Sequence, residues 1–268
     1  MSENALALVT GASKGLGREM ALGLARAGHK VVAVARSKSA LESLAKENPD
    51  LIFPFECDVS EVKSVTALAE RVKQELGDVQ ILVNAAGVFG PIDLIHNTDP
   101  EQWAQTILID TLAPYFTTRA FLPGMLAKRW GRVINVSSAA ALHPPGALNS
   151  AYGTSKVALN QFTRHLAAEI SGSGVTANVI HPGDVKTEMW ADIKAKAIAL
   201  GEVGKDYTAW VDWVAQTGGD DPKKATDLVL DIVSPEYDGI NGRFLWIKEP
   251  LQAPIPSWDD PVDARPWS

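Results

Sequence analysis

The chain has 268 residues, of which 46% are hydrophobic and 21% are charged, and these proportions predict one globular domain with a sizeable core. The net charge of -7 and the isoelectric point near 5.3 argue against a general affinity for nucleic acid or a membrane surface, because either would need a basic face. Cys57 is the single cysteine, which excludes an intramolecular disulfide and predicts a reducing, cytoplasmic compartment. The N-terminus does not resemble a secretion signal, and no apolar run approaches the roughly 20 residues that span a bilayer.

The first apolar run, residues 5–9, leads into a glycine-rich turn and then into apolar residues at helical spacing. The turn reads Thr10-Gly11-Ala12-Ser13-Lys14-Gly15-Leu16-Gly17. A strand, a glycine turn and a helix in this order are typical of dinucleotide binding, because backbone N–H groups must approach a pyrophosphate closely. The spacing differs from the usual G-x-G-x-x-G, and such a turn can also be an ordinary loop. Its place after the first strand favours a cofactor site, which a side chain at Gly11 or Gly17 would obstruct.

The second predicted strand, residues 31–35, ends at Arg36 and Ser37, and this position distinguishes the two nicotinamide cofactors. In a dinucleotide-binding fold an acidic residue here binds the ribose hydroxyls of NAD, whereas a basic residue accepts the 2′-phosphate of NADP. Arg36 can bind a phosphate through two N–H groups, Ser37 can add a hydrogen bond, and Lys14 can add charge. Either cation alone could be an ordinary solvated side chain. Together they favour NADP(H), with NAD(H) as the alternative.

Further apolar runs alternate with helical patterns along the rest of the chain. Strands are expected at 51–56, 79–83, 132–136, 175–180 and 243–247, and helices at 61–76, 100–128, 152–170 and 222–233. Pro114 and Pro123 are expected to kink or end the helical region 100–128. Apolar strands alternating with helices predict an α/β fold with a seven-stranded, mostly parallel, doubly wound sheet and helices on both faces. Such sheets bind ligands at the carboxyl ends of their strands, where the small residues of Asn84-Ala85-Ala86-Gly87 would let a cofactor approach.

Tyr152 and Lys156 lie four residues apart in the helix expected after the fifth strand, so their side chains share one face. A tyrosine hydroxyl has an ordinary pKa of about 10, and a nearby ammonium lowers that pKa by favouring the phenolate. The pair could therefore act as a general acid or base, although solvated surface pairs have the same spacing. Ser138 follows the strand 132–136 and would point its hydroxyl into the cofactor crevice, unless it and Ser137 form an ordinary turn.

Six motifs stand in order along the chain. They are Thr10-Gly-x-x-x-Gly-x-Gly17, Asp58-Val59, Asn84-Ala-Ala-Gly87, Ser138, Tyr152-x-x-x-Lys156 and Pro182-Gly183-x-x-x-Thr187. These motifs resemble those of the short-chain dehydrogenase/reductases, and the resemblance runs from about residue 6 to residue 247. It implies a Rossmann-fold, NAD(P)-dependent oxidoreductase that forms a homodimer or homotetramer. The implied partner is a small carbonyl or alcohol substrate, and no metal is implied.

The resemblance also implies residue roles. Tyr152 would donate the proton to the carbonyl oxygen during reduction, Ser138 would hydrogen-bond that oxygen, and Lys156 would hold the nicotinamide ribose and lower the Tyr152 pKa. Asp58 and Val59 would flank the adenine, Asn84 and Gly87 the adenosine ribose region, and Thr187 the nicotinamide amide. The implied cofactor-binding residues are Gly11, Ser13, Lys14, Gly15, Leu16, Gly17, Arg36, Ser37, Asp58, Val59, Asn84, Ala85, Gly87, Tyr152, Lys156, Pro182, Gly183, Val185 and Thr187.

Two positions depart from the family pattern. Asp110 stands where the family usually carries a catalytic asparagine, and Ala85 replaces a second asparagine. In the family the first asparagine acts largely through its main-chain carbonyl and a water, so Asp110 would preserve the proton relay. Alternatively, a carboxylate near Lys156 would alter the relay. We expect activity to survive Asp110, which joins Ser138, Tyr152 and Lys156 as a candidate catalytic residue.

Residues 1–248 are expected to form the cofactor-binding and catalytic domain. Within it, residues 188–219 read as irregular and would close over the substrate. Their tryptophans, Trp190, Trp210 and Trp213, would form an apolar wall or pack against the protein's own surface. Residues 249–268 form a tail whose five prolines exclude a regular helix or a central strand. Two tryptophans in this tail favour docking on the same or a neighbouring subunit.

The sequence thus predicts an NADPH-dependent reductase that transfers hydride to a ketone or aldehyde carbonyl and runs in reverse as an alcohol dehydrogenase. An NAD-dependent secondary-alcohol dehydrogenase is the alternative enzyme. A catalytically impaired, cofactor-binding regulatory protein is the alternative from another class, with Asp110 as its support. The identity of the substrate depends on the shape that residues 188–219 build.

Overall fold

The computed structural model describes residues 4–142 and 146–247, whose strands form one sheet in the order β3-β2-β1-β4-β5-β6-β7. The strands are β1 Leu6–Thr10, β2 Lys30–Ala35, β3 Ile52–Glu56, β4 Ile81–Asn84, β5 Gly131–Val136, β6 Val175–His181 and β7 Phe244–Trp246. Every pairing between these strands is parallel, which confirms the predicted seven-stranded sheet. The strand order reverses between β1 and β4, and doubly wound sheets bind ligands at such a point.

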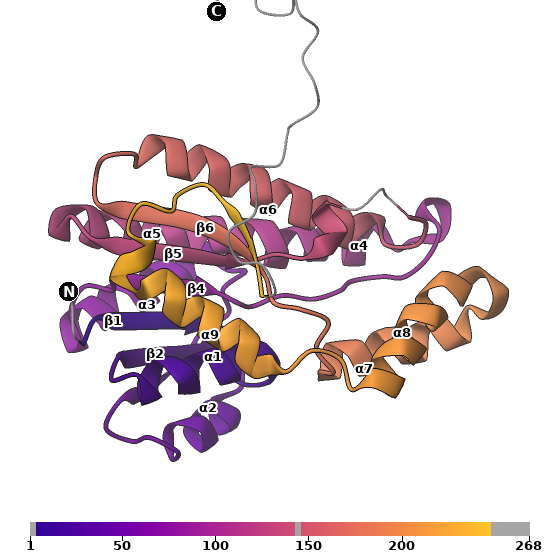
Figure 1. Ribbon diagram of the computed structural model, residues 1–268, viewed down its shortest axis with the longest axis horizontal. Helices are drawn as coiled ribbons and strands as arrows, with labels where there is room; N and C mark the ends of the chain where they lie inside the picture. The colour runs from indigo at the N-terminus through magenta and orange to yellow at the C-terminus, as the bar shows by residue number, and fades with distance from the viewer. Residues whose placement is uncertain (1–3, 143–145, 248–268) are drawn as a thin grey trace, which may run out of the picture.

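Helices cover both faces of this sheet (Figure 1). One face carries α1 Gly15–Arg26, α2 Lys38–Ala45 and α9 Pro222–Val233, and the other carries α3 Val62–Glu75, α5 Ala113–Lys128 and α6 Ser150–Glu169, with α4 Pro100–Ile107 packed on α6. Successive residues of β1 face alternate cores. Ala7 and Val9 join the core with α1 and α9, and Leu6 and Leu8 join the core with α3, α5 and α6. Because both faces are buried, most residues of the strands are apolar.

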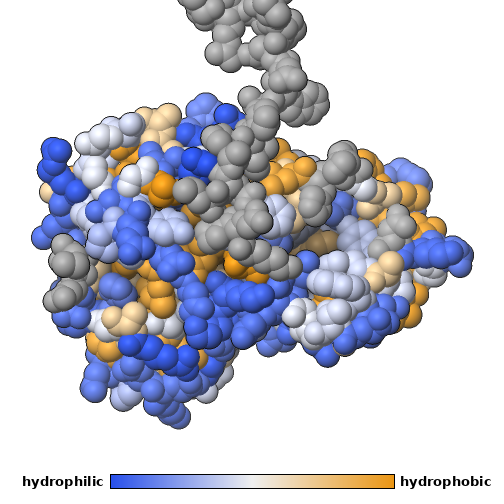
Figure 2. All heavy atoms as spheres, in the orientation of Figure 1, coloured by the Kyte–Doolittle hydropathy of each residue, from blue (hydrophilic) through white to orange (hydrophobic). Residues whose placement is uncertain are grey.

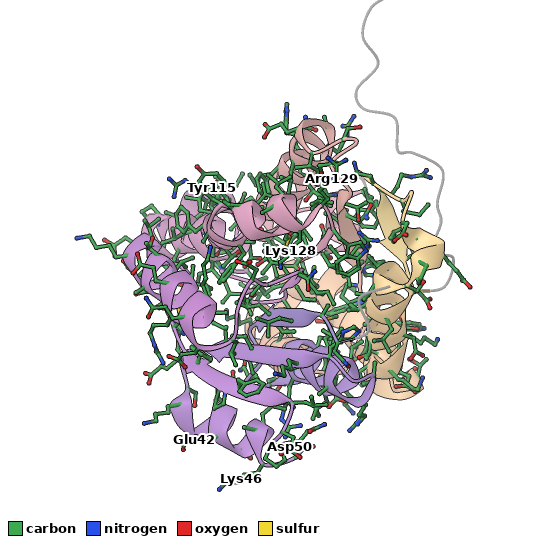
Figure 3. The ribbon with its side chains drawn as sticks, turned by 90° about the vertical axis from the view of Figure 1, so that its left-hand side faces the viewer. Glu42, Lys46, Asp50, Tyr115, Lys128 and Arg129 are labelled. Atoms are coloured by element: carbon green, nitrogen blue, oxygen red, sulfur yellow. The ribbon has the colours of Figure 1, made fainter. Side chains whose placement is uncertain are left out.

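Helix α2 is absent from the sequence-based expectations. It is short, and Leu41 and Leu44 are its two buried residues, so its apolar pattern is weak. Glu42 and Lys46 project outward from it (Figure 3), in a region of the surface that is mostly hydrophilic (Figure 2). Ser37 begins the helix, because its Oγ accepts a hydrogen bond from Ala40 N at 3.4 Å.

The expectation that residues 188–219 are irregular is wrong. They form α7 Glu188–Ala199, a 3-10 turn Gly201–Gly204 and α8 Lys205–Thr217, a helical pair that extends beyond the carboxyl end of the sheet (Figure 1). Ile193 in α7 and Val211 and Val214 in α8 are buried in a third apolar cluster. The helices are held by this cluster, and the lysines and tryptophans between these positions obscure its period in the sequence.

The prolines of the region 100–128 have different effects. Helix α4 continues through a π-helical turn, Leu108–Leu112, into α5. Pro114 directly follows the π-helical turn in this continuous helix and lacks the N–H that would bond a carbonyl of that turn. Pro123 lies inside α5 and does not end it. The irregular point is the π-helical turn, which carries Asp110, and such turns are frequent at functional sites.

The expectation for the tail, residues 249–268, lies outside the described ranges. Within residues 4–142 and 146–247, no helix is long and apolar enough to cross a membrane. The same residues include no group of three or more His, Cys, Asp or Glu side chains that could hold a metal ion.

Candidate active site

The glycine turn after β1 packs directly against the turn after β4. Gly11 has a φ of +68°, and a Cβ there would come within 2.8 Å of Ala86 Cα. A Cβ on Gly17 would lie 2.5 Å from the Gly11 carbonyl oxygen. The Thr10 hydroxyl oxygen accepts hydrogen bonds from Ala85 N and Ala86 N, both at 3.1 Å. The two turns therefore form one stretch of closely packed backbone at the carboxyl ends of β1 and β4, as a dinucleotide site requires.

The segment after β6 shares a groove with the glycine turn. Gly15 and Leu16 line this groove together with Val185 and Thr187. The Thr187 hydroxyl oxygen also accepts a hydrogen bond from Trp190 N at 3.4 Å and thereby caps α7. Predicted cofactor-binding residues from opposite ends of the chain thus meet in one groove.

Arg36 and Lys14 are both exposed, Arg36 directly after β2 and Lys14 directly before α1. Asp58 lies near Arg36. Burial raises the pKa of the Asp58 carboxyl, but hydrogen bonds from Ser60 and the charge of Arg36 outweigh burial and leave the pKa below its ordinary value. Asp58 Oδ1 accepts from Ser60 N at 3.0 Å and from Ser60 Oγ at 2.7 Å. Ser37, expected to bind a phosphate, is the cap of α2.

Asn84 is 2% exposed, and its amide is engaged inside the protein. Its Nδ2 donates to Asn135 Oδ1 at 2.8 Å, and its Oδ1 accepts from Thr117 Oγ1 at 2.7 Å. Asn135 Nδ2 donates in turn to Thr163 Oγ1 at 2.8 Å. These neutral side chains link α5, β4, β5 and α6. The Asn84 amide therefore belongs to the scaffold beneath the site, and the sequence carries no signal of this role.

Ser138, Tyr152 and Lys156 meet at the carboxyl end of β5. Ser138 follows the strand, and α6 carries the other two residues one turn apart. The Ser138 side chain hydrogen-bonds the Tyr152 hydroxyl, and Lys156 Nζ lies 5.4 Å from the centre of the Tyr152 ring. The adjacent Ser137 is buried, and its hydroxyl shares a hydrogen bond of 2.6 Å with Asn160 Oδ1. Ser138 is thus the serine that faces Tyr152.

Asp110 is completely buried beside Lys156. Its Oδ2 lies 3.3 Å from Lys156 Nζ and 3.4 Å from Ser155 Oγ, and its Oδ1 accepts a hydrogen bond from Val88 N at 2.8 Å. Lys156 Nζ also donates to Val136 O at 3.2 Å. An ammonium has three N–H donors, so one donor of Lys156 is left for a ligand once these two partners are counted.

Burial and the charges of neighbouring groups shift the pKa values of Tyr152, Lys156 and Asp110. Burial raises the pKa of the Tyr152 hydroxyl, Lys156 opposes the rise, and Asp110 adds to it. Lys156 acts in the expected direction, but the net pKa of Tyr152 lies above rather than below its ordinary value. Burial opposes the charge of Lys156, yet Asp110 and Tyr152 outweigh burial and raise the Lys156 pKa. Burial raises the pKa of Asp110 against the attraction of Lys156. Tyr152 is therefore a neutral phenol at physiological pH.

Phe89, Asp184 and Tyr207 surround Tyr152 and are absent from the residues predicted from sequence. Phe89 stacks on the Tyr152 ring with the ring centres 4.5 Å apart. Asp184, in the loop after β6, raises the Tyr152 pKa, and Tyr207 of α8 is electrostatically coupled to Tyr152. Phe89 comes two residues after Gly87, so its position at a strand end is a signal that could have found it. Tyr207 has no such signal, because its place depends on how α8 folds back.

The tryptophans of residues 188–219 occupy three different environments. Trp190 is 8% exposed within the third apolar cluster, and Trp210 is partly buried against that cluster. Trp213 is 45% exposed on the outer side of α8. Trp190 and Trp210 therefore pack against the protein's own apolar cluster, as one of the two expectations had it, and Trp213 does not.

Comparison with known proteins agrees with this geometry. Residues 5–198 match the family model described as short chain dehydrogenase. Short chain dehydrogenase pigC of Monascus ruber is 33% identical over 246 residues, which cover 88% of this chain and 76% of pigC. The 3-oxoacyl-(acyl-carrier-protein) reductase FabG of Vibrio cholerae is 31% identical over 91% of this chain and 96% of its own length. The chain spans half the length of another relative, short chain dehydrogenase tazN of Aspergillus terreus, at 40% identity and 88% coverage of this chain.

The fold is also that of a solved ketoreductase. A crystal structure of a variant of actinorhodin polyketide ketoreductase with NADPH superposes with a TM-score of 0.83 at 26% identity, over 92% of this chain and 96% of the other. The family model spans most of the chain, and the full-length reductase match extends it to nearly all of the described residues. The chain therefore belongs to the short chain dehydrogenase family and is an NAD(P)-dependent oxidoreductase.

Proposed function

We propose that this chain is an NADPH-dependent reductase that transfers hydride to the carbonyl of a ketone or aldehyde and runs in reverse as an alcohol dehydrogenase. The observation that carries the proposal is the meeting of Ser138, Tyr152 and Lys156 at the carboxyl end of β5. Strand β5 is the neighbour of β4, whose turn packs on the glycine turn. The names of two similar proteins, a polyketide ketoreductase and a 3-oxoacyl reductase, support a carbonyl substrate.

The residues present fit NADPH. The glycine turn leads into the N-terminus of α1, where backbone N–H groups suit a pyrophosphate, and a Cβ on Gly11 or Gly17 would clash with the protein backbone of this tight turn. Arg36 and Lys14 are exposed cations that suit a 2′-phosphate, and Lys156 has a donor for the nicotinamide ribose. When NADPH is bound, it supplies the hydride that the carbonyl carbon accepts. The solved ketoreductase with NADPH supports this choice of cofactor.

Tyr152 would supply the proton. Its raised pKa keeps the hydroxyl protonated, so it can donate a proton to the carbonyl oxygen as negative charge develops there. Ser138 would hydrogen-bond the same oxygen, and the positive charge of Lys156 would stabilise the tyrosinate that remains. In the reverse direction the Tyr152 tyrosinate accepts the proton, and the raised pKa leaves little tyrosinate at neutral pH, so alcohol oxidation should rise with pH. Helices α7 and α8 would cover the substrate.

Replacing Tyr152 with phenylalanine tests the proton donor directly. We expect Tyr152→Phe to lower the rate of NADPH oxidation by at least about 10²-fold across a panel of ketones and aldehydes, because general acid catalysis is lost. NADPH binding, measured by fluorescence titration, should be retained. Tyr115→Phe is the matched control, because Tyr115 is 44% exposed on α5.

Two outcomes would contradict the proposal. Near-normal turnover by Tyr152→Phe would remove Tyr152 from the role of proton donor. Tight NADPH binding by the natural protein, with no turnover of any carbonyl in the panel, would instead favour an impaired cofactor-binding protein. The buried carboxylate of Asp110 beside Lys156 is the observation that supports this second candidate.

Arg36→Asp tests the choice between NADPH and NADH. Loss of a charge-assisted hydrogen bond is worth about 1.5–3 kcal/mol, so the preference for NADPH should fall by roughly 10- to 100-fold. The measurement is the ratio of kcat/KM for the two cofactors with one ketone. Arg26→Asp is the control, because Arg26 is an exposed arginine at the far end of α1. An unchanged ratio in Arg36→Asp would exclude Arg36 as the phosphate ligand.

A cytoplasmic homodimer or homotetramer is the proposed assembly. The single cysteine is buried, which suits a reducing compartment. Leu112, Tyr115 and Val157 are exposed apolar residues of the layer that contains α5 and α6, and Figure 3 shows Tyr115 at its surface. Light scattering of the purified full chain measures the mass, and a monomer at micromolar concentration would contradict the proposal.

A further inference from the structure

A row of three aromatic rings stands beside the candidate catalytic residues. Phe89 stacks on the Tyr152 ring, with ring centres 4.5 Å apart and planes inclined by 29°. Tyr207 meets Phe89 edge-on at 6.0 Å and 85°. Aromatic pairs prefer offset-stacked and edge-to-face arrangements of this kind. The row connects α6, the segment after β4 and α8, and proton transfer alone does not require it.

The side chains around this row are apolar. Phe89 and Tyr207 pack against the third apolar cluster, to which the buried residues Ile92, Leu148 and Trp190 belong. Leu148 has a φ of +77°, a backbone conformation that a leucine rarely adopts. A strained residue persists when its surroundings hold it, and here the strain places a leucine in the cluster beside the first turn of α6. Four separate segments of the chain, residues 89–92, Leu148, α7 and α8, thus build one apolar wall.

Two polar groups of this wall have partners, whereas Trp190 Nε1 is buried without a hydrogen-bond partner among the described residues. The Tyr207 hydroxyl hydrogen-bonds the Asn149 side chain, and burial raises the pKa of Tyr207, so it stays neutral. Trp210 Nε1 donates to Asp184 Oδ1 at 3.2 Å. Asp184 is a carboxylate close enough to raise the Tyr152 pKa. Lys186 Nζ and Lys194 Nζ lie 5.2 Å and 5.3 Å from the centre of the Trp190 ring, so charges of both signs border the wall. Phe89 and Tyr207 are partly exposed, and the wall therefore offers flat aromatic surface.

We propose that the substrate is a ketone or aldehyde with a flat aromatic ring close to its carbonyl, and that Phe89 and Tyr207 select this ring. The ring lies against the wall while the carbonyl oxygen reaches the hydroxyls of Tyr152 and Ser138. A flat ring makes stacking contacts that a puckered saturated ring with the same number of carbons cannot make. This selection rests on the proposed carbonyl reduction and gives it a substrate class.

Phenylacetone and cyclohexylacetone form a matched pair of probes. Each has a six-membered ring one methylene away from a methyl ketone, and they differ in the flatness of the ring. The measurement is kcat/KM for both ketones with NADPH, expressed as the ratio of aromatic to saturated substrate. We expect the natural protein to prefer phenylacetone, and the ratio to fall by up to about tenfold in Phe89→Leu and in Tyr207→Leu, the scale of an aromatic pair.

Two further variants serve as controls. Tyr207→Phe keeps the ring and should keep the ratio. Phe53→Leu makes the same replacement as Phe89→Leu on the edge strand β3 and should also leave the ratio unchanged. Because each ratio is formed within one variant, a loss of active protein cancels. If Phe89→Leu does not fold, Tyr207→Leu decides, because Tyr207 lies on a different element.

Three results would overturn the selection. One is an unchanged ratio of kcat/KM for phenylacetone over cyclohexylacetone in both Phe89→Leu and Tyr207→Leu. If both ketones then react more slowly at the same ratio, Phe89 acts through Tyr152 and does not select the substrate ring. Another is a natural protein that reduces other carbonyls but neither of these two, and the third is one that prefers cyclohexylacetone. If the natural protein reduces no carbonyl at all, the proposed function itself is wrong. This result differs from the three above, so failure of the proposed function is distinguishable from failure of the aromatic selection.

Discussion

The two ends of β5 each hold a buried cation, and the protein satisfies the two cations differently. At the start of the strand, Arg132 is 1% exposed. Its Nε donates to Ile232 O at 3.2 Å, its Nη1 donates to Gly131 O at 2.8 Å, and its Nη2 pairs with Asp238. Its guanidinium also lies over the Trp130 ring, 4.5 Å from the ring centre. Arg132 therefore ties β5 to α9 and to the segment after it.

At the other end of β5, Lys156 donates to the last carbonyl of the strand, that of Val136, and pairs with Asp110. The two counterions differ in their exposure to solvent. The Asp238 side chain is 59% exposed and is solvated by water, whereas the Asp110 side chain is fully buried. Four of the five guanidinium N–H donors have protein partners, since Nη1 also donates to Gly174 O at 3.4 Å, and two of the three ammonium donors do. The guanidinium binds groups of α9 and of segments next to β5, whereas the ammonium lies beside Tyr152 and keeps a donor for a ligand. The first cation therefore fixes the fold, and the second can take part in chemistry.

Arg132→Met should give the largest effect on stability and little effect on activity. The substitution keeps an apolar stem but leaves the carbonyls of Ile232 and Gly131 without their donor, and each unsatisfied buried group costs about 1–3 kcal/mol. We expect the free energy of unfolding, measured by urea denaturation, to fall by about 2–3 kcal/mol. Ketone reduction well below the melting temperature should remain near normal. Lys128→Met is the control, because Lys128 is exposed at the end of α5 (Figure 3).

Ordinary surface substitutions change the free energy of unfolding by less than about 0.5 kcal/mol. A loss this small in Arg132→Met would show that Arg132 does not stabilise the fold. A large loss of activity with normal stability would reverse the comparison between the two ends of β5.

Asp110→Asn should act on the pH dependence of the reaction. Asp110 raises the pKa of Tyr152, so removal of its charge lowers that pKa. Alcohol oxidation with NADP⁺ requires Tyr152 without its proton, and the rising limb of kcat/KM against pH should therefore move to lower pH. The rate of reduction at neutral pH should change by less than about tenfold, because Tyr152 still has a proton to give. Asp238→Asn removes the same charge at the other end of β5 and should not move the limb.

A rise of kcat by orders of magnitude in Asp110→Asn would show that the natural relay is impaired. If the rising limb of kcat/KM against pH does not move in Asp110→Asn, the charge of Asp110 does not affect the pKa of Tyr152.

The sequence predicts those parts of the site that depend on local chemistry. Gly11 and Gly17 are required where two turns pack against each other, and the spacing of Tyr152 and Lys156 on one helix fixes their common face. The apolar strands follow from burial on both faces of a parallel sheet. The resemblance to a family placed Ser138 beside Tyr152, a contact between two elements that spacing alone does not give.

Contacts between distant segments could not be predicted. Arg132 and Asp238 are 106 positions apart, and neither has a local pattern that names its partner. Burial raises the Tyr152 pKa above its ordinary value, and burial depends on the whole fold. Residues 188–219 read as irregular because the cluster that holds α7 and α8 includes residues far away in the chain, Ile92 and Leu148. Packing in the third apolar cluster therefore stabilises the helices of residues 188–219.

Asp238→Asn should have the smallest effect. The Asp238 side chain is 59% exposed, and pairs that water screens contribute about 0–1 kcal/mol. The amide that replaces the carboxylate keeps an oxygen that accepts from Arg132, so the free energy of unfolding in urea should fall by less than about 1 kcal/mol. The deficit should shrink further as salt is added, because exposed charges are screened. A loss above about 2 kcal/mol that salt does not reduce would mean that Asp238 is coupled to Arg132 as a buried counterion is. The two ends of β5 would then hold the same kind of ion pair, and the exposure of the counterion would not distinguish the structural cation from the reactive one.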